Sequence, residues 1–475
     1  MTEKRAKIVC TLGPKSSDQE TISKLIRAGM DVARLNFSHG THADHLKVIE
    51  AIRAASKETG RIVGIMADLQ GPKIRVARFE EGFIDLKQGQ RFTLTTREVV
   101  GNEEQVSTTY KGLPQDLKSG DIVLLDDGLL SLKVIETTET DVVCEVEIGG
   151  VLSNSKGINI PTAALTMDIL SPKDLADTDF ALEQGLDFIA LSFVRHPDDV
   201  EQLRSYLKKK DSTTPIITKI EKPQALDYLD EVIEASDAVM VARGDLGVEI
   251  PAEQVPPIQK KIISKCNATG TPVITATQML ESMIRNPRPT RAEASDVANA
   301  ILDGSDAVML SAESAAGKYP VLAVETMNRI IQAAEENQNA NAGSTKNGNS
   351  GPLPVNMAIA ISACAIADQV QARAIASITL SGSMARELSR SRPSQPIYAL
   401  TQHEEVLRRL SLVWGVEGLL AGDLAMNNID EALPQIERLL VNLGKLARGE
   451  QFVLTAGLPF SARKATNMVR VDTVP

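Results

Sequence analysis

The chain has 475 residues, which is more than one hydrophobic core usually supports, so two or three folded units are expected. Its 43% apolar and 24% charged residues are the composition of a globular protein and exclude a disordered or fibrous one. The net charge of -11 argues against nucleic acid or an anionic membrane as a partner, whereas a local basic pocket for small phosphorylated molecules remains compatible with it.

The cysteines and the start of the chain predict a cytoplasmic location. The four cysteines are Cys10, Cys144, Cys266 and Cys364. They lie far apart in the sequence without the spacing of metal ligands, which favours reduced thiols over disulfides or a zinc site. No apolar stretch approaches the roughly 18 residues of a membrane span, and the charged N-terminus lacks the apolar region of a signal peptide.

Short apolar runs that end in polar residues or glycine predict about eight strands along most of the chain. They cover residues 7–12, 31–37, 62–69, 188–193, 215–221, 238–241, 272–277 and 307–311. Amphipathic segments such as residues 21–28, 45–56 and 198–210 separate most of them, so the pattern predicts repeated strand-helix units. Eight such units indicate an α/β fold of the TIM (β/α)8 barrel type.

An insertion and a C-terminal unit accompany this barrel. Residues 71–167 are too many for a barrel connection and alternate in polarity, which predicts an inserted small β-barrel that acts as a lid domain. Residues 335–354 have the polar composition of a linker, and five further apolar runs after it predict a C-terminal α/β domain. The expected domains are residues 1–70 and 168–340 for the barrel, 71–167 for the lid and 355–475 for the C-terminal domain.

The polar residues at the ends of the predicted strands are the candidates for chemistry, because a TIM barrel carries its active site there. They are Arg34, Asn36, Ser38, His39, Asp68, Lys219, Glu221, Arg243, Asp245, Thr275, Thr277, Ser311 and Glu313. We expect these side chains to converge on one pocket.

Two of these candidates are carboxylates on neighbouring strands. Glu221 and Asp245 offer the hard oxygen ligands that suit Mg²⁺, with a structural salt-bridge network as the alternative. Lys219 lies two residues before Glu221 and points to the same side of its strand, so with Arg34 it can neutralise a phosphoryl group in transfer. A lone histidine in a turn, such as His39, is more often a local hydrogen-bonding residue than a catalytic base.

Several separate blocks resemble the pyruvate kinase family, in the same order along the chain. They are Arg34-Leu-Asn-Phe-Ser-His-Gly40, Asp68-Leu-Gln-Gly-Pro-Lys-Ile-Arg75, Ile217-Thr-Lys-Ile-Glu221, Ala242-Arg-Gly-Asp-Leu-Gly-Val-Glu249 and Thr275-Ala-Thr-Gln-Met-Leu-Glu-Ser282. The resemblance implies transfer of a phosphoryl group from phosphoenolpyruvate to ADP, giving pyruvate and ATP in the last step of glycolysis. It also implies Mg²⁺, or Mn²⁺ in its place, and a homotetramer regulated at the C-terminal domain by a phosphorylated metabolite.

The resemblance further implies a role for each of the matching positions. The expected catalytic residues are Lys219, Arg34 and Thr277, and the expected substrate-binding residues are Arg34, Lys219, Gly244, Asp245 and Thr277. The metal is expected at Glu221 and Asp245, and the nucleotide at Arg75, Lys156, Asn36 and His39. The monovalent-cation site is expected at Asn36, Ser38 and Asp68. Taken alone, a basic residue such as Arg75 or Lys156 is more often a solvated surface charge.

Two departures from the family pattern lead to finer expectations. Potassium-dependent relatives typically have Thr-Lys-Gly-Pro-Glu after the aspartate, where this chain has residues 69–73 as Leu-Gln-Gly-Pro-Lys. We expect the Lys73 ammonium to lie near Asn36, Ser38 and Asp68 and to replace potassium, with an exposed hinge lysine as the alternative. The expected effector site consists of four uncharged residues, Thr379, Ser381, Gly382 and Ser383, with Arg463 and Lys464 as helpers. A simple capping loop is the alternative.

The sequence leaves two rival functions open. A Mg²⁺-dependent barrel lyase or aldolase uses the same enolate chemistry without a nucleotide, and it does not require a lid with Arg75 and Lys156. A catalytically silent regulatory homologue is the second rival, because fold does not dictate activity. The intact set of Lys219, Glu221 and Asp245 argues against the second.

Overall fold

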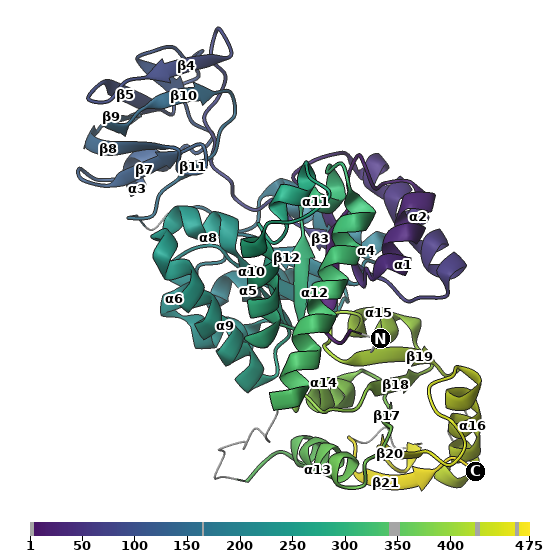
Figure 1. Ribbon diagram of the computed structural model, residues 1–475. Coiled ribbons are helices and arrows are strands. Elements are labelled where there is room, and N and C mark those ends of the chain that lie inside the picture. The colour runs from purple at the N-terminus through teal and green to yellow at the C-terminus, as the bar shows by residue number, and fades with distance from the viewer. Residues whose placement is uncertain (1–3, 164–165, 342–351, 423–427, 461–464) are drawn as a thin grey trace.

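The computed structural model describes residues 4–163, 166–341, 352–422, 428–460 and 465–475 (Figure 1). Within them a closed parallel barrel has the strand order β1-β16-β15-β14-β13-β12-β3-β2. Its strands are β1 (Lys7–Thr11), β2 (Val32–Asn36), β3 (Gly64–Asp68), β12 (Phe188–Leu191), β13 (Ile216–Ile220), β14 (Ala238–Ala242), β15 (Val273–Ala276) and β16 (Ala307–Leu310). Each lies within or next to one of the predicted apolar runs, and the predicted TIM barrel is confirmed.

Helices surround the barrel. They are α1 (Gln19–Ala28), α2 (His42–Thr59), α4 (Pro172–Glu183), α5 (Pro197–Lys209), α6 (Gln224–Asp227), α7 (Leu229–Ala235), α8 (Arg243–Glu249), α9 (Val255–Thr269), α10 (Arg291–Leu302), α11 (Ala312–Ala315) and α12 (Pro320–Asn341), with 3₁₀ turns η1 (Ala252–Gln254) and η2 (Glu281–Ile284). Capping boxes begin several of them, as where Thr41 and Asp44 satisfy each other's backbone N–H groups at the start of α2. None of the helices described is long and apolar enough to cross a membrane.

The insertion between β3 and α4 folds around its own apolar core. It contains β4 (Phe83–Leu86), β5 (Arg91–Thr95), β6 (Gln105–Ser107), α3 (Leu113–Asp116), β7 (Ile122–Leu125), β8 (Leu130–Thr137), β9 (Asp141–Ile148), β10 (Gly150–Ser153) and β11 (Ile158–Asn159). Its hydrogen bonds form a six-stranded sheet, β11-β7-β8-β9-β5-β6, and a two-stranded sheet, β10-β4. Figure 1 shows this unit projecting from the barrel on the side of α8. Two extended segments, residues 69–74 after β3 and residues 159–163 from the end of β11, lead between the barrel and this unit and are called the hinge strands below.

The C-terminal unit is an α/β sheet with the order β19-β18-β17-β20-β21, in which β21 alone runs antiparallel to its neighbour among the strands described. It contains α13 (Val355–Gln369), β17 (Ala374–Ile378), α14 (Ser383–Arg390), β18 (Ile397–Thr401), α15 (Glu404–Leu410), β19 (Val416–Leu420), α16 (Ile429–Asn442), β20 (Gln451–Ala456) and β21 (Met468–Thr473). The predicted C-terminal α/β domain is confirmed.

The polar segment between barrel and C-terminal unit begins later than its composition indicated. Helix α12 continues through Glu335 to Asn341, where a linker was expected. The reason is tertiary: the buried Glu335 carboxylate accepts hydrogen bonds from the backbone N–H groups of Arg5 at 2.9 Å and Ala6 at 2.7 Å, which fixes this turn against the barrel. Residues 342–351 of the expected linker lie outside the described part of the chain.

Candidate active site

A buried ionic network joins the carboxyl ends of β2, β3 and β13. Arg34 Nε donates to Asp68 Oδ2 at 2.6 Å, and Lys219 Nζ lies 3.2 Å from Asp68 Oδ1. The same Lys219 Nζ lies 2.9 Å from Glu221 Oε1, as expected for two residues on one side of a strand. Four of the predicted site residues, far apart in sequence, are thus brought together by the barrel.

Burial and charge compete at this network, and the balance differs for each group. Burial alone disfavours the charged form of Asp68, but Lys219 and Arg34 outweigh it and hold the pKa of Asp68 below its ordinary value. Burial also opposes the charge of Lys219, but attraction by Asp68 and Glu221 raises its pKa well above the ordinary value. The ammonium group is therefore fully charged at neutral pH.

Glu221 has the opposite balance. Burial raises its pKa, Lys219 lowers it, Asp245 raises it, and the net result lies above the ordinary value. Its Oε2 accepts a hydrogen bond from the backbone N–H of Phe193 at 2.8 Å, which fixes the direction of the carboxylate. Two mutually repelling carboxylates in one site favour a bound cation.

Glu221 and Asp245 fit a divalent magnesium ion by their donor chemistry. Both offer carboxylate oxygens, and Mg²⁺ commonly takes one or two protein carboxylates and fills its other positions with water and substrate oxygens. A cluster of three or more histidine, cysteine or acidic ligands is absent among the residues described, which is compatible with such a sparse ligand set.

The start of helix α8 lies directly after β14 and faces Thr277. The backbone N–H of Gly244 donates to Thr277 Oγ1 at 2.8 Å, and the same hydroxyl donates to the carbonyl of Ala276 at 2.6 Å. Thr277 has a φ of 70°, a left-handed conformation that is unfavourable for a β-branched residue. Such a position is typical of a functional site, where the surrounding structure maintains the strain.

The predicted nucleotide residues divide between lid and barrel. In the lid, Arg75 Nη1 donates to the carbonyl of Ser155 at 2.9 Å, and Lys156 Nζ lies 2.7 Å from Asp126 Oδ1. In the barrel, Asn36 Oδ1 accepts from the Ser38 backbone N–H at 3.1 Å. The carbonyl of His39 is bonded to a ring nitrogen of His45 at 2.9 Å.

Lys73 makes a different ion pair from the expected one. Its Nζ lies 3.8 Å from Asp245 Oδ1, whereas the sequence indicated Asn36, Ser38 and Asp68 as neighbours. The first hinge strand of the lid therefore brings its cation to the start of α8. Asp68 already has two cationic neighbours in Arg34 and Lys219.

Two residues of the network were missed from the sequence. Ser192 Oγ accepts from Lys219 Nζ at 2.8 Å and donates to the carbonyl of Leu69 at 2.7 Å. Thr11 Oγ1 accepts from Arg34 Nη1 at 2.8 Å. Both lie near the ends of the first and fourth predicted runs, so the rule that polar residues at the carboxyl ends of strands form the site would have found them if it had been applied there.

The predicted effector residues lie at the start of α14, in the C-terminal sheet. Gly382 is left-handed, with a φ of 79°, and its backbone N–H donates to Thr379 Oγ1 at 2.9 Å. Ser381 Oγ donates to Ser383 Oγ at 3.2 Å, and both serines are exposed. Arg463 and Lys464 lie outside the described residues.

Comparison with known proteins gives one consistent result. Residues 3–324 match the family model for the pyruvate kinase barrel domain, and residues 357–472 match the model for its alpha/beta domain. A pyruvate kinase of Mycobacterium tuberculosis (strain H37Rv) is 46% identical over 99% of this chain and 98% of its own length. One from Geobacillus stearothermophilus is 46% identical over 99% of this chain and 81% of its own length.

A solved structure gives the same result in three dimensions. The crystal structure of a pyruvate kinase from Cryptosporidium parvum has a TM-score of 0.91 and 39% sequence identity, covering 99% of this chain and 96% of that one. Two family models, full-length relatives and a solved structure thus agree with the barrel, insertion and C-terminal sheet of this chain. The chain therefore belongs to the pyruvate kinase family and is a phosphotransferase.

Proposed function

We propose that the pocket at the carboxyl ends of the barrel strands transfers the phosphoryl group of phosphoenolpyruvate to ADP, with Lys219 and Arg34 as its cations. The observation that carries this is the position of Lys219 Nζ, which is buried and lies within 3.2 Å of both Asp68 and Glu221. A coupled assay of pyruvate release, with phosphoenolpyruvate, ADP and Mg²⁺ each omitted in turn, tests it. Release without ADP would mean that the phosphoryl group goes to water, which contradicts a kinase, and no release at all would favour a lyase of another substrate or a silent homologue.

The transfer step depends on fixed positive charge. The P–O bond of phosphoenolpyruvate breaks as an oxygen of the ADP β-phosphate attacks the phosphorus in line, and negative charge spreads over the equatorial oxygens. Arg34 and Lys219 are held by Asp68 before substrate arrives, so they stabilise this charge without reorganising. A magnesium ion at Glu221 and Asp245, when bound, supplies further positive charge to the phosphoryl oxygens.

The second step is protonation of the enolate of pyruvate that transfer leaves behind. Its carboxylate is assigned to the Gly244-Asp245 turn and Thr277, at the start of α8. The methylene carbon gains a proton through a water or hydroxyl relay near Thr277, because a neutral threonine hydroxyl is by itself a poor acid. Arg75 and Lys156 of the lid, with Asn36 and His39 of the barrel, are assigned to the nucleotide.

We also propose that the enzyme works without potassium. The support is a charge balance: Asp68 is compensated by Arg34 and Lys219, and Lys73 brings a further ammonium to within 3.8 Å of Asp245. A cation that belongs to the chain requires no binding equilibrium. The expected monovalent site of Asn36, Ser38 and Asp68 therefore has no unmet requirement for positive charge.

Turnover should be similar, within about twofold, in sodium, potassium or a bulky organic cation at matched ionic strength. Lys73→Glu should lower turnover roughly tenfold or more, because it places a carboxylate beside Asp245, and added potassium should restore part of it. The measurement is the steady-state rate in each salt, with Lys87→Glu at an exposed position of the lid as the control. An unmodified enzyme that is nearly inactive until potassium is added would refute this.

We further propose a homotetramer activated by a phosphorylated metabolite at the start of α14. The first N–H groups of this helix have no side-chain cap, so they can receive a phosphate, and the hydroxyls of Ser381 and Ser383 lie exposed beside them. Light scattering of the purified protein tests the tetramer, and a mass other than four subunits would contradict it.

The double variant Ser381→Ala, Ser383→Ala should abolish most of this activation while the rate without effector stays unchanged. The expected loss is about tenfold in effector affinity, because two hydroxyl contacts to a charged phosphate are removed. Activation curves with a panel of sugar phosphates and nucleotides measure it, and Ser394→Ala, an exposed serine elsewhere in the same unit, is the control. If every curve is unchanged, the effector binds elsewhere.

A cytoplasmic location is also proposed. It is supported by the four cysteines, all of which are buried and unpaired, as in proteins kept in a reducing compartment. Fractionation of the source cells tests it, and recovery of the protein outside the cytoplasm would contradict it.

A further inference from the structure

The inserted domain is tied to the barrel through a buried carboxylate that the proposed mechanism does not use. Glu249 ends helix α8, and its side chain is fully buried. Its Oε1 accepts a hydrogen bond from Asn159 Nδ2 at 2.8 Å, and Asn159 belongs to strand β11 of the lid. The same Oε1 pairs with the ammonium of Lys222, which directly follows Glu221 in the chain.

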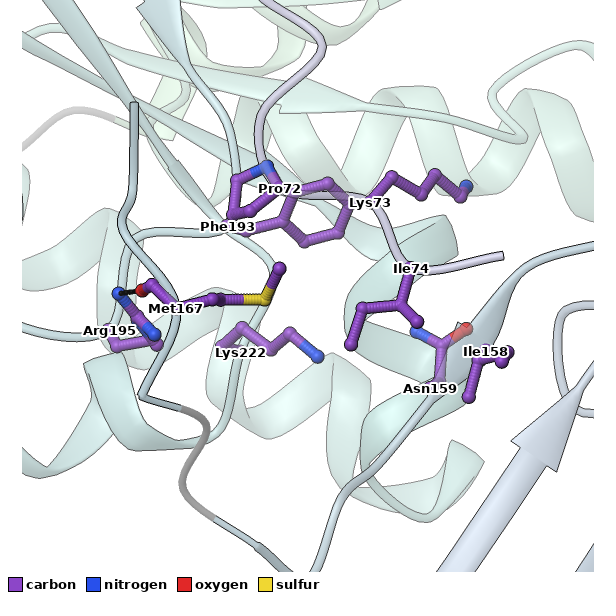
Figure 2. Close-up of a pocket in the computed structure, with 9 residues that line it drawn as sticks. All are labelled: Pro72, Lys73, Ile74, Ile158, Asn159, Met167, Phe193, Arg195 and Lys222. Atoms are coloured by element: carbon purple, nitrogen blue, oxygen red, sulfur yellow. Dashed lines mark hydrogen bonds between the residues drawn. The ribbon is translucent and has the colours of Figure 1, made fainter. Parts of the chain in front are cut away.

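The Asn159–Glu249 contact lies where the lid meets the barrel. A cavity of about 30 Å³ lies between the two hinge strands and the barrel. The residues that line it include Asn159, Lys222, Lys73, Ile74, Met167 and Phe193. Figure 2 shows the Lys222 side chain extending toward Ile74 and Asn159, which belong to opposite hinge strands. The two hinge strands thus meet the barrel beside one small cavity.

Helix α8 makes two further contacts with the lid side. At its start, Asp245 pairs with Lys73 of the first hinge strand at 3.8 Å. Near its end, a Cβ added to Gly128 of the lid would lie 3.5 Å from Val248 Cγ1, so the lid turn rests against the helix. One short helix therefore carries the proposed substrate turn at its start and has contacts with the lid side at both of its ends.

The Glu249 carboxylate is only partly satisfied. Its Oε2 is buried without a hydrogen-bond partner among the described residues. Counted with their backbone atoms, Glu249 and Asn159 are each only 5% exposed. A buried charge is stable only while its partners are present, so loss of the Asn159 bond leaves the carboxylate with Lys222 alone. The energy of the contact therefore depends on the position of the lid.

We propose that Glu249 is a positioning residue that, through Asn159 and Lys222, latches the inserted domain onto α8. The latch holds the lid in the position in which Arg75 and Lys156 reach the nucleotide, and in this respect it rests on the proposed function. Opening the lid separates Asn159 from Glu249, whereas the Lys222 pair stays within the barrel. The Asn159–Glu249 hydrogen bond is thus a contact that opening of the lid breaks.

The test is a reversal of this hydrogen bond. Asn159→Asp faces the Glu249 carboxylate with a second carboxylate and should shift the lid toward an open state. Adding Glu249→Gln to that variant restores a donor–acceptor pair with the same net charge, because the Gln amide donates to the new aspartate. Asn102→Asp is the matched control, since this exposed lid residue accepts its backbone hydrogen bonds through an oxygen that aspartate retains.

Lid position is measured by energy transfer between dyes on Lys47→Cys in α2 and Lys87→Cys in the lid of the intact enzyme, where the four native cysteines are buried. The open-to-closed ratio should rise about tenfold in Asn159→Asp, as expected for loss of one hydrogen bond to a charged group, and return to within about threefold in the double variant. The KM for ADP should follow the same pattern. If Asn159→Asp does not fold, Asn159→Ala removes the donor without adding charge and should shift the ratio in the same direction.

The possible outcomes separate the latch from the proposed function. An unchanged ratio in Asn159→Asp or Asn159→Ala, or a double variant that stays open, overturns the latch. A ratio that follows the latch while the KM for ADP stays constant supports it and instead removes Arg75 and Lys156 from the nucleotide site. A shift of the same size in Asn102→Asp also overturns it, because the effect would then come from lid charge alone.

Discussion

Replacing Lys219 with methionine should reduce phosphoryl transfer by at least about a hundredfold to a thousandfold while the barrel remains folded. The ammonium is the cation that the structure places between Asp68 and Glu221, and methionine keeps the length of the side chain without its charge. Removing one preorganised charge-stabilising donor from an active site typically costs about that much in kcat. The measurement is the rate of pyruvate formation at saturating phosphoenolpyruvate, ADP and Mg²⁺.

The fold should survive this change because its neighbours keep other partners. Asp68 retains Arg34 at 2.6 Å, and Glu221 retains the Phe193 N–H at 2.8 Å. Thermal unfolding and circular dichroism of the variant check this, and Lys47→Met, an exposed lysine on α2, controls for loss of a lysine elsewhere. A folded Lys219→Met enzyme with near-normal turnover would remove Lys219 from the mechanism.

The barrel could be predicted because its strands are buried on both faces. Residues Ile216 to Ile220 are isoleucines apart from Thr218 and Lys219, and such a run is recognisable without any structure. The charged residue is Lys219, so the same pattern that gives the strand also marks the site. Glu221 lies two residues after Lys219, and side chains two residues apart on a strand point to the same side, so their common direction could be predicted.

The rest depended on contacts between segments far apart in the chain. The pairing of Lys73 with Asp245 is set by the path of the hinge strand, which no local pattern encodes. The helical state of Glu335 to Asn341 likewise follows from the carboxylate contacts of Glu335 with the N-terminus, although the composition there is typical of a linker. Tertiary contacts override local propensity in both places.

Glu221 at the proposed metal site is the second residue whose replacement has a large expected effect. Glu221→Gln keeps the size of the side chain, and its amide oxygen can still accept from the Phe193 N–H, but one ligand charge is lost. We expect turnover and apparent Mg²⁺ affinity to fall together, each by at least roughly tenfold to a hundredfold, the loss typical even of residues one step beyond the ligands. Titration of activity with Mg²⁺, and with Mn²⁺ in a parallel series, measures both.

The Glu221→Gln variant also distinguishes two roles of Glu221, that of a metal ligand and that of a structural partner of Lys219. If Glu221 only compensated Lys219, Glu221→Gln would weaken binding of the phosphorylated substrate or the fold, and the Mg²⁺ titration would keep its midpoint. If Glu221 is a ligand, saturating metal should recover part of the lost turnover, because the electrostatic attraction of one carboxylate is replaced by concentration. Asp68→Asn is the informative comparison, since Asp68 contacts the same Lys219 and is not assigned to the metal. An unchanged midpoint in Glu221→Gln, or an equal shift in Asp68→Asn, would therefore place the magnesium ion elsewhere in the pocket.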